Sequence, residues 1–136
     1  MLRSNLINNA YLVGSRLGLT ADDMLCCSPP LFHCFGLVCG PLAAIAHGAT
    51  AIIPSDVFNA NASVRACIGE GCTVINAVPM MFQAMLDHAR RQPIEAKFKL
   101  RTGIIAGASL QETLTRRLAD EMGLKGLAYG FGKSLS

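Results

Sequence analysis

Apolar and polar positions alternate along this chain with periods that predict an ordered series of helices and strands. The series opens with an amphipathic helix, which Ser4 can cap and Gly18 ends. Its apolar residues recur at helical spacing and are expected on one inward face: Leu6, Ile7, Ala10, Val13 and Leu17. The first segment is therefore expected to form a helical layer over a core.

After this helix, strand-like and helix-like segments follow each other in turn. The expected strands cover residues 24–28, 50–53, 73–77, 102–106 and 124–129. The expected helices cover residues 35–46, 62–68, 79–91 and 110–122, with a charged loop at 92–99. Residues 35–46 are apolar on all sides, which predicts burial on every side. Because parallel strands need crossover helices, the order predicts an α/β fold: a doubly wound, mostly parallel sheet with helices on both faces.

Composition narrows the class of protein further. The chain has 136 residues, enough for one domain at most, and is 51% hydrophobic and 15% charged. This composition excludes disorder, collagen and coiled coil. A net charge of +3 with 6% aromatic residues offers neither a basic stripe nor a stacking surface, so nucleic-acid binding is not expected. So high an apolar content predicts a core that is larger than the polar surface of this chain can cover. Such a core is typical of one part of a larger domain.

The six cysteines are expected to be free thiols in the core. Neither a Cys-x-x-Cys pair nor a histidine at zinc-ligand spacing accompanies them, so no metal site is expected. Residues 24–55 lack charged side chains, but prolines and glycines interrupt them, so no transmembrane helix is expected. A cytoplasmic location is expected. A mitochondrial one is the alternative, because the first 21 residues lack acidic side chains and include Arg3 and Arg16.

Five sequence blocks, in order, resemble the AMP-forming acyl-CoA synthetases of the adenylate-forming superfamily. The blocks are Ser28-Pro-Pro-Leu-Phe-His-Cys-Phe-Gly36, His47-Gly-Ala-Thr50, Val78-Pro-Met-Met-Phe82, Leu100-Arg-Thr-Gly103, and Ala106-Gly-Ala-Ser109 followed by Tyr129-Gly130. The resemblance extends from about Ser4 to Gly130. The Pro-Pro-Leu-Phe-His form is most similar to the medium-chain fatty acyl-CoA ligase branch.

This resemblance implies a reaction and an acid-binding region. Family members join a carboxylic acid to ATP, releasing pyrophosphate, and then transfer the acyl group from the adenylate to CoA. By resemblance His33 is the catalytic residue, because a ring nitrogen beside the carboxylate can donate to developing charge. Acyl-binding positions are Phe35, Val78, Met80 and Met81. Core packing explains these acyl-binding positions equally well. His33 can also be a structural residue at a strand end.

The resemblance also implies nucleotide-binding positions. Gly107, Ala108 and Ser109 match a small-residue turn that lets the backbone approach the nucleotide. Tyr129, followed by Gly130, matches the aromatic residue that stacks on adenine.

The chain also departs from the family pattern. The family's phosphate loop precedes the matched region, and its C-terminal domain with the catalytic lysine follows it. Where the family has a Thr-Glu pair for phosphate and Mg²⁺, this chain has Phe131-Gly132-Lys133, and lysine cannot replace a carboxylate ligand. Residues 1–136 are therefore expected to form a partial AMP-binding domain without a bound metal. Family members need ATP or AMP, CoA and Mg²⁺, but this chain is not expected to retain any of them as a bound cofactor.

Two hypotheses follow. In the first, the chain is a truncated acyl-CoA ligase-like protein of fatty-acid or secondary metabolism that is non-catalytic alone and self-associates through uncovered apolar faces. In the second, it is a non-catalytic module that binds acyl groups or nucleotides, or pairs with a full-length synthetase. Its small-molecule partners in either case are a fatty or other carboxylic acid and an adenine nucleotide. Whether the chain is itself an enzyme stays open.

Overall fold

The computed structural model describes residues 2–91 and 97–130, which form one parallel sheet with helices on both faces. The strands are β1 (Met24–Cys27), β2 (Thr50–Ile52), β3 (Val74–Ala77), β4 (Thr102–Ala106) and β5 (Gly126–Gly130), in the spatial order β2-β1-β3-β4-β5. The helices are α1 (Arg3–Leu17), α2 (Cys34–Leu37), η1 (Val38–Leu42), α3 (Ala43–Ala46), α4 (Ala60–Gly69), α5 (Pro79–Arg91) and α6 (Glu112–Met122). The predicted α/β fold is confirmed.

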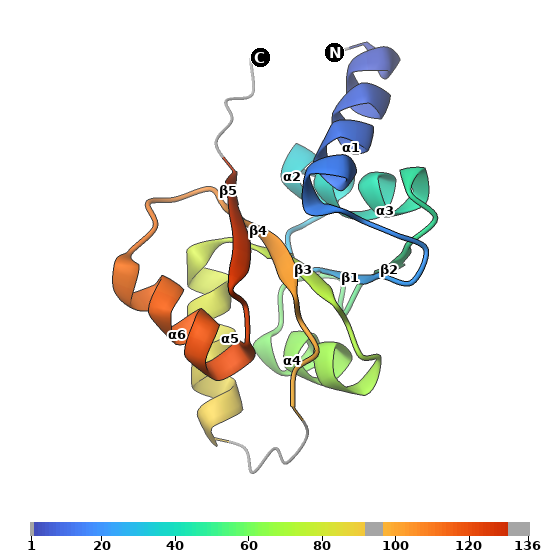
Figure 1. The fold of residues 1–136 in the computed structure, drawn as a ribbon. Helices are drawn as coiled ribbons and strands as arrows, with labels where there is room; N and C mark the ends of the chain where they lie inside the picture. Colours follow the sequence, from blue (N-terminus) through green and yellow to red (C-terminus); the bar gives the residue numbers. More distant parts are fainter. Residues whose placement is uncertain (1, 92–96, 131–136) are drawn as a thin grey trace.

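Alternation of side chains along each strand divides the core into two apolar clusters. Cys26, Ile75 and Ile105 face α4, α5 and α6 in the larger cluster. Leu25 and Ile104 face α1 and α3 in the smaller one. Figure 1 shows α1 to α3 on one side of the sheet and α4 to α6 on the other. Among the helices of residues 2–91 and 97–130, none has the length and apolar character needed to cross a membrane.

The segment predicted as a helix over residues 35–46 is broken and only partly buried. It forms α2, η1 and α3 in succession, because Gly40 leaves the helical region (φ −96°, ψ −106°) just before Pro41. The expectation of burial on every side is wrong. The segment covers one face of the sheet, while Ile45 is 71% exposed and Leu37 also reaches the surface.

Helix α1 differs from the sequence prediction at its start. Leu2 occupies the N-cap position without a side-chain hydrogen bond, so Ser4 is not the cap. The predicted end is confirmed, since Gly18 adopts the left-handed conformation with φ 64°. On the predicted inward face, Ala10 and Leu17 are buried, but Ile7 is exposed. The first turns of α1 therefore extend beyond the sheet that they were expected to cover.

An ion pair holds the amino-terminal edge of the sheet together. Arg101 donates to both oxygens of Asp23 (Nη2 to Oδ2, 2.5 Å; Nε to Oδ1, 3.0 Å) and to the carbonyls of Leu17 and Gly18. The hydroxyl of Thr73 also donates to Asp23 Oδ1 at 2.7 Å. Arg101, although part of a family-like block, thus joins β1, β3, β4 and the end of α1, at the edge opposite the strands' carboxyl ends.

The Asp23 carboxylate is expected to make the free energy of unfolding fall at acid pH. Burial alone would raise the pKa of Asp23, but hydrogen bonds from Arg101, the Thr20 N–H and Thr73 outweigh it and lower the pKa from 3.8 to about 2. The stabilisation, about 2 kcal/mol, is present above the unfolded pKa and is lost as the pH falls toward 2. Urea unfolding of Asp23→Asn between pH 5 and 2 should therefore show a flatter pH profile than wild type. Asp22→Asn, at the exposed neighbouring position, should keep the wild-type slope, and an unchanged slope in Asp23→Asn would contradict this role.

Candidate functional site

The predicted site residues lie at the carboxyl edge of the sheet, where the order of strands reverses. The chain passes from β1 outward to β2, crosses back to β3, and then continues through β4 to β5 on the other side. The crevice outside neighbouring parallel strands at such a switch point is where ligands bind in open α/β sheets. The loops that follow β1, β3 and β4 meet there, and each contains predicted site residues (Figure 1).

His33 stands at the end of the loop after β1 as the N-cap of α2. Its Nδ1 accepts a hydrogen bond from the Phe35 N–H at 3.1 Å. A neutral imidazole that accepts at Nδ1 carries its proton on Nε2. The His33 ring is exposed, so this Nε2–H remains available as a donor. The N-cap hydrogen bond therefore uses Nδ1 of His33, and Nε2 takes no part in it.

Gly36 packs against the two prolines that precede His33. A Cβ at Gly36 would lie 2.0 Å from the Pro30 carbonyl oxygen, so only glycine allows this approach. Beneath it, the buried Cys27 thiol donates to the Gly36 carbonyl at 3.3 Å. Burial raises the pKa of the Cys27 thiol to about 11, with a smaller contribution from the neighbouring Cys39, so this thiol is a packing group.

The turn after β4 is close to the loop after β3. Gly107 has φ +90°, a conformation that favours glycine, and a Cβ there would lie 3.0 Å from Val78 Cγ1. Val78 directly follows β3 and is half-buried. The structure thus brings together Gly107, predicted to bind the nucleotide, and Val78, predicted to bind the acyl group.

Tyr129 of β5 fixes the same turn from the other side. Its hydroxyl donates to the Ala108 carbonyl at 3.0 Å, while the side chain remains 49% exposed. Gly130 lies opposite Ala106 in the β4–β5 pairing, and a Cβ at Gly130 would approach Ala106 Cβ to 3.0 Å. Four of the five predicted nucleotide-binding residues therefore take part in these two contacts or lie directly beside them: Gly107, Ala108, Tyr129 and Gly130. Ser109, the fifth, continues that turn.

The predicted acyl-binding residues divide into two groups. Exposed Met80 and Ser109 line a hollow of about 210 Å³ between the starts of α5 and α6. Phe35 and Met81 instead pack, half-buried, against the smaller and larger apolar clusters. Met80 is thus exposed at a hollow, whereas packing alone accounts for Phe35 and Met81. Within residues 2–91 and 97–130, no hydrogen bond joins His33 to the Gly107 turn.

The chain matches a known protein family. The sequence model of the family described as AMP-binding enzyme matches residues 2–133. This chain belongs to the AMP-binding enzyme family. The resemblance inferred from the five sequence blocks is therefore confirmed, and the Phe131-Gly132-Lys133 departure lies at the end of the match, outside the described residues.

Curated relatives of this AMP-binding segment are acyl-CoA ligases. The chain is 45% identical over 128 residues to acyl-CoA ligase SID4 of Ajellomyces capsulatus, a match that covers 94% of this chain and 22% of the relative. It is 37% identical over 133 residues to the mitochondrial medium-chain acyl-CoA ligase ACSF2 of Danio rerio, covering 94% of this chain and 21% of the relative. The chain therefore spans about a fifth of the length of the curated relatives it matches.

Solved structures share the fold of this AMP-binding segment. The apo structure of MbtA from Mycobacterium smegmatis superposes with a TM-score of 0.76 at 25% identity, over 93% of this chain and 23% of that one. The inhibitor-bound N-terminal domain of FACL13 from Mycobacterium tuberculosis gives 0.76 at 21% identity, over 94% of this chain and 31% of that domain. The matched fold thus makes up less than a third of each of these two chains.

Sequence reasoning missed two buried polar groups that support the carboxyl edge of the sheet. The Asn76 side chain donates to the Cys39 carbonyl at 2.7 Å and accepts from the Ile104 N–H at 3.2 Å, and so joins η1, β3 and β4. The Ser28 hydroxyl donates to the Ser63 hydroxyl at 3.4 Å, joining β1's end to α4. A lone polar residue inside the apolar run of residues 74–77 was the signal for Asn76.

A second hollow, of about 230 Å³, also escaped sequence reasoning. It lies between the loops after β1 and β2, and its lining includes Ser28, Phe32, Asp56 and Phe58. Asp56 and Phe58 follow β2 in a segment without a family-like block, so nothing in the sequence pattern marked them.

Proposed function

We propose that this carboxyl edge forms part of the acid- and adenine-nucleotide-binding site of an AMP-forming acyl-CoA ligase. The observation that carries the proposal is the fixed turn at Gly107, against Val78 on one side and hydrogen-bonded to Tyr129 on the other. A small-residue turn with an exposed aromatic ring beside it offers backbone groups and a stacking face to one planar ligand. Membership of the AMP-binding enzyme family makes adenine the expected ligand.

Each residue then has a distinct expected role. The Tyr129 ring, held by the Ala108 carbonyl, stacks on adenine. Gly107 lets the backbone approach the bound acyl-nucleotide group without a side chain in between. The His33 Nε2–H, left free because Nδ1 caps α2, donates to the charge that develops on the acid's carboxyl group. These roles stay predictions for the individual side chains.

The acid substrate is proposed to be a fatty acid of medium length, with Met80 against its alkyl chain. Met80 is 81% exposed at the hollow that it shares with Ser109, and flexible thioethers suit apolar chains of variable shape. Among the relatives, the Danio rerio protein is named as a medium-chain acyl-CoA ligase. The compartment, cytoplasmic or mitochondrial, stays a prediction.

The 136 residues by themselves are proposed not to catalyse adenylation. Lys133 stands where the family has a carboxylate for Mg²⁺. A cationic side chain does not fit a hard cation, which needs oxygen ligands. No step through Mg²⁺ is therefore assigned to these residues.

The 136-residue chain should give no carboxylate-dependent ATP–pyrophosphate exchange with octanoate, measured with radiolabelled pyrophosphate. The blank without octanoate and a His33→Ala variant should give the same background rate. Exchange above the blank that His33→Ala abolishes would contradict the proposal that these residues are inactive alone. Exchange that persists in His33→Ala would instead indicate a contaminating ligase.

We further propose that the isolated chain self-associates through the α1–α3 face. Exposed apolar side chains collect on these two adjacent helices: Ile7, Tyr11, Leu12 and Ile45. All four are more than half exposed, which is unusual for large apolar residues on two neighbouring elements. The occupant proposed for this face is a second copy of the chain, because that copy presents the same apolar residues.

A further inference from the structure

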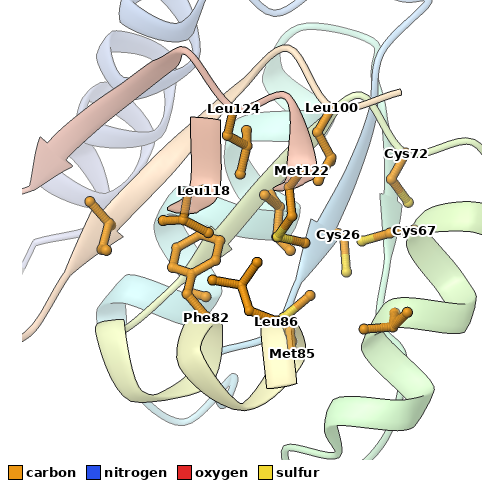
Figure 2. Packing of buried hydrophobic residues seen from close by; sticks show 14 of the residues in the cluster. Cys26, Cys67, Cys72, Phe82, Met85, Leu86, Leu100, Leu118, Met122 and Leu124 are labelled. Carbon is orange, nitrogen blue, oxygen red and sulfur yellow. The ribbon is translucent and has the colours of Figure 1, made fainter. Parts of the chain in front are cut away.

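Three cysteine thiols meet inside the larger apolar cluster. Cys26 lies on β1, Cys67 on α4, and Cys72 just before β3. All three are fully buried free thiols, and their Sγ atoms lie within 4.8 Å of one another. Figure 2 shows the three side chains gathered at one end of the cluster, apart from Phe82 and Leu118. The six cysteines are free, as predicted, but the expectation that all lie in the core is wrong for Cys34, which is exposed at the start of α2. The convergence of Cys26, Cys67 and Cys72 was not foreseen.

The spacing of the sulfurs suits one shared atom. Bonds of about 2.3 Å to three sulfurs place those sulfurs about 4 Å apart or less. The observed separations are therefore within about 1 Å of that value, a change that small side-chain rotations can supply. Existing contacts of the thiols are long: Cys72 Sγ lies 3.6 Å from the Ala66 carbonyl, and Cys26 Sγ lies 3.9 Å from the Ser28 hydroxyl.

The donor set selects a soft ligand. The three possible ligand atoms are all sulfur. Among the described residues, neither a carboxylate nor an imidazole joins this group. Hard cations such as Mg²⁺ and Ca²⁺ prefer oxygen, whereas thiolates select thiophilic elements. Structural Zn²⁺ sites use four protein ligands, and this group provides three.

The burial of the three thiols in an apolar cluster restricts the net charge of the complex that they can form. The three thiols belong to the larger apolar cluster, whose other buried members include Val64, Ile75 and Met122. An uncompensated charge in such a place is costly. Three thiolates around a monovalent or divalent ion leave a net negative charge, whereas three thiolates on a trivalent centre leave none.

We infer that Cys26, Cys67 and Cys72 form a three-thiol site for a trivalent arsenical. Arsenous acid is uncharged at neutral pH, and so is its product with three thiols. Neither species therefore needs a counterion in the apolar core. Three As–S bonds form as three As–O and three S–H bonds break, and each thiol proton leaves with a hydroxyl group as water. The oxidation state of arsenic does not change, so no oxidant or reductant is needed.

Native mass spectrometry of the 136-residue chain with arsenite, in a phosphine reductant, tests the site. The expected adduct has one arsenic atom in place of three hydrogens. An adduct that keeps an arsenic hydroxyl shows only two thiols engaged and would overturn the three-thiol site, as would the absence of an adduct. Thermal unfolding should shift upward by about 10 °C at a hundredfold excess over Kd, because arsenite must bind the folded state preferentially. A downward shift would show binding to the unfolded chain and would also overturn the inference.

Variants separate this site from the other thiols. Cys67→Ala and the more conservative Cys72→Ser should both lose the three-hydrogen adduct and the thermal shift, while circular dichroism reports whether each is folded. Cys34→Ala, at an exposed cysteine outside the cluster, should keep both. Loss of the adduct in Cys34→Ala, or equal stabilisation of wild type by Zn²⁺ or Cu(I), would contradict the inference. The wild-type adduct decides the matter even where a variant fails to fold.

Discussion

The Gly103→Ala variant is expected to lose a large part of its folding free energy. Gly103 lies opposite Ile75 in the β3–β4 pairing, and an added Cβ would lie 1.9 Å from the Ile75 carbonyl oxygen. That oxygen is backbone, so it cannot move aside without opening the pairing between two central strands. Opening it exposes Ile104 and Ile105, which are now buried. The expected loss is at least about 3–5 kcal/mol of a total of about 5–15 kcal/mol.

Gly69→Ala is the matched control for this substitution. Gly69 is the last residue of α4, and an added Cβ there meets nothing within 4 Å. Alanine should leave stability unchanged or raise it by up to about 1 kcal/mol. Urea unfolding followed by circular dichroism measures both variants. A Gly103→Ala protein with a near-wild-type midpoint would show that β3 and β4 do not approach as described.

Charged substitutions on the α1–α3 face are expected to convert an associated chain into a monomer. Leu12 and Ile45 are 64% and 71% exposed, so lysine and glutamate at these positions disrupt no core packing. Size-exclusion chromatography with light scattering at micromolar concentration should show oligomers for wild type. The Leu12→Lys/Ile45→Glu variant should shift toward the 14.4 kDa monomer.

Val57→Glu provides the control for a general gain in charge. Val57 is 77% exposed but lies between β2 and α4, outside the α1–α3 face. It should leave the oligomers unchanged. A sharp wild-type monomer peak with cooperative unfolding would contradict self-association, and monomerisation by Val57→Glu would contradict the choice of face.

The fold was largely predictable because local signals and tertiary packing agree in most elements. Pro79 fits the first turn of a helix, and α5 begins there as expected. β4 occupies the predicted residues 102–106, a short segment with two β-branched isoleucines that ends before Gly107. The break at Gly40 was harder to foresee, because the apolar pattern of residues 35–46 is continuous. Hydrophobicity alone also could not show that Ile45 faces outward, since apolar surface is hidden only where something covers it.

The candidate site was predictable in its residues but not in its contacts. Glycines and small residues marked the Gly107 turn, yet the hydrogen bond from Tyr129 to the Ala108 carbonyl depends on the β4–β5 register. The Cys26, Cys67 and Cys72 cluster is similar in this respect. Topology, rather than sequence spacing, brings β1, α4 and the start of β3 together.

The central claim is that the turn at Gly107 and the Tyr129 ring bind adenine, and nuclear magnetic resonance titration with AMP tests it most directly. The Leu12→Lys/Ile45→Glu variant, if monomeric, is the protein to use, with Tyr129→Ala added as the comparison. Stacking alone contributes on the order of 1–3 kcal/mol, so Kd should be millimolar or weaker. The account predicts that AMP shifts the amide signals of residues 107–109 and 129–130, and that Tyr129→Ala abolishes these shifts. Shifts confined to other residues, or unaffected by Tyr129→Ala, would contradict it, and a micromolar Kd would favour a dedicated nucleotide-binding module instead.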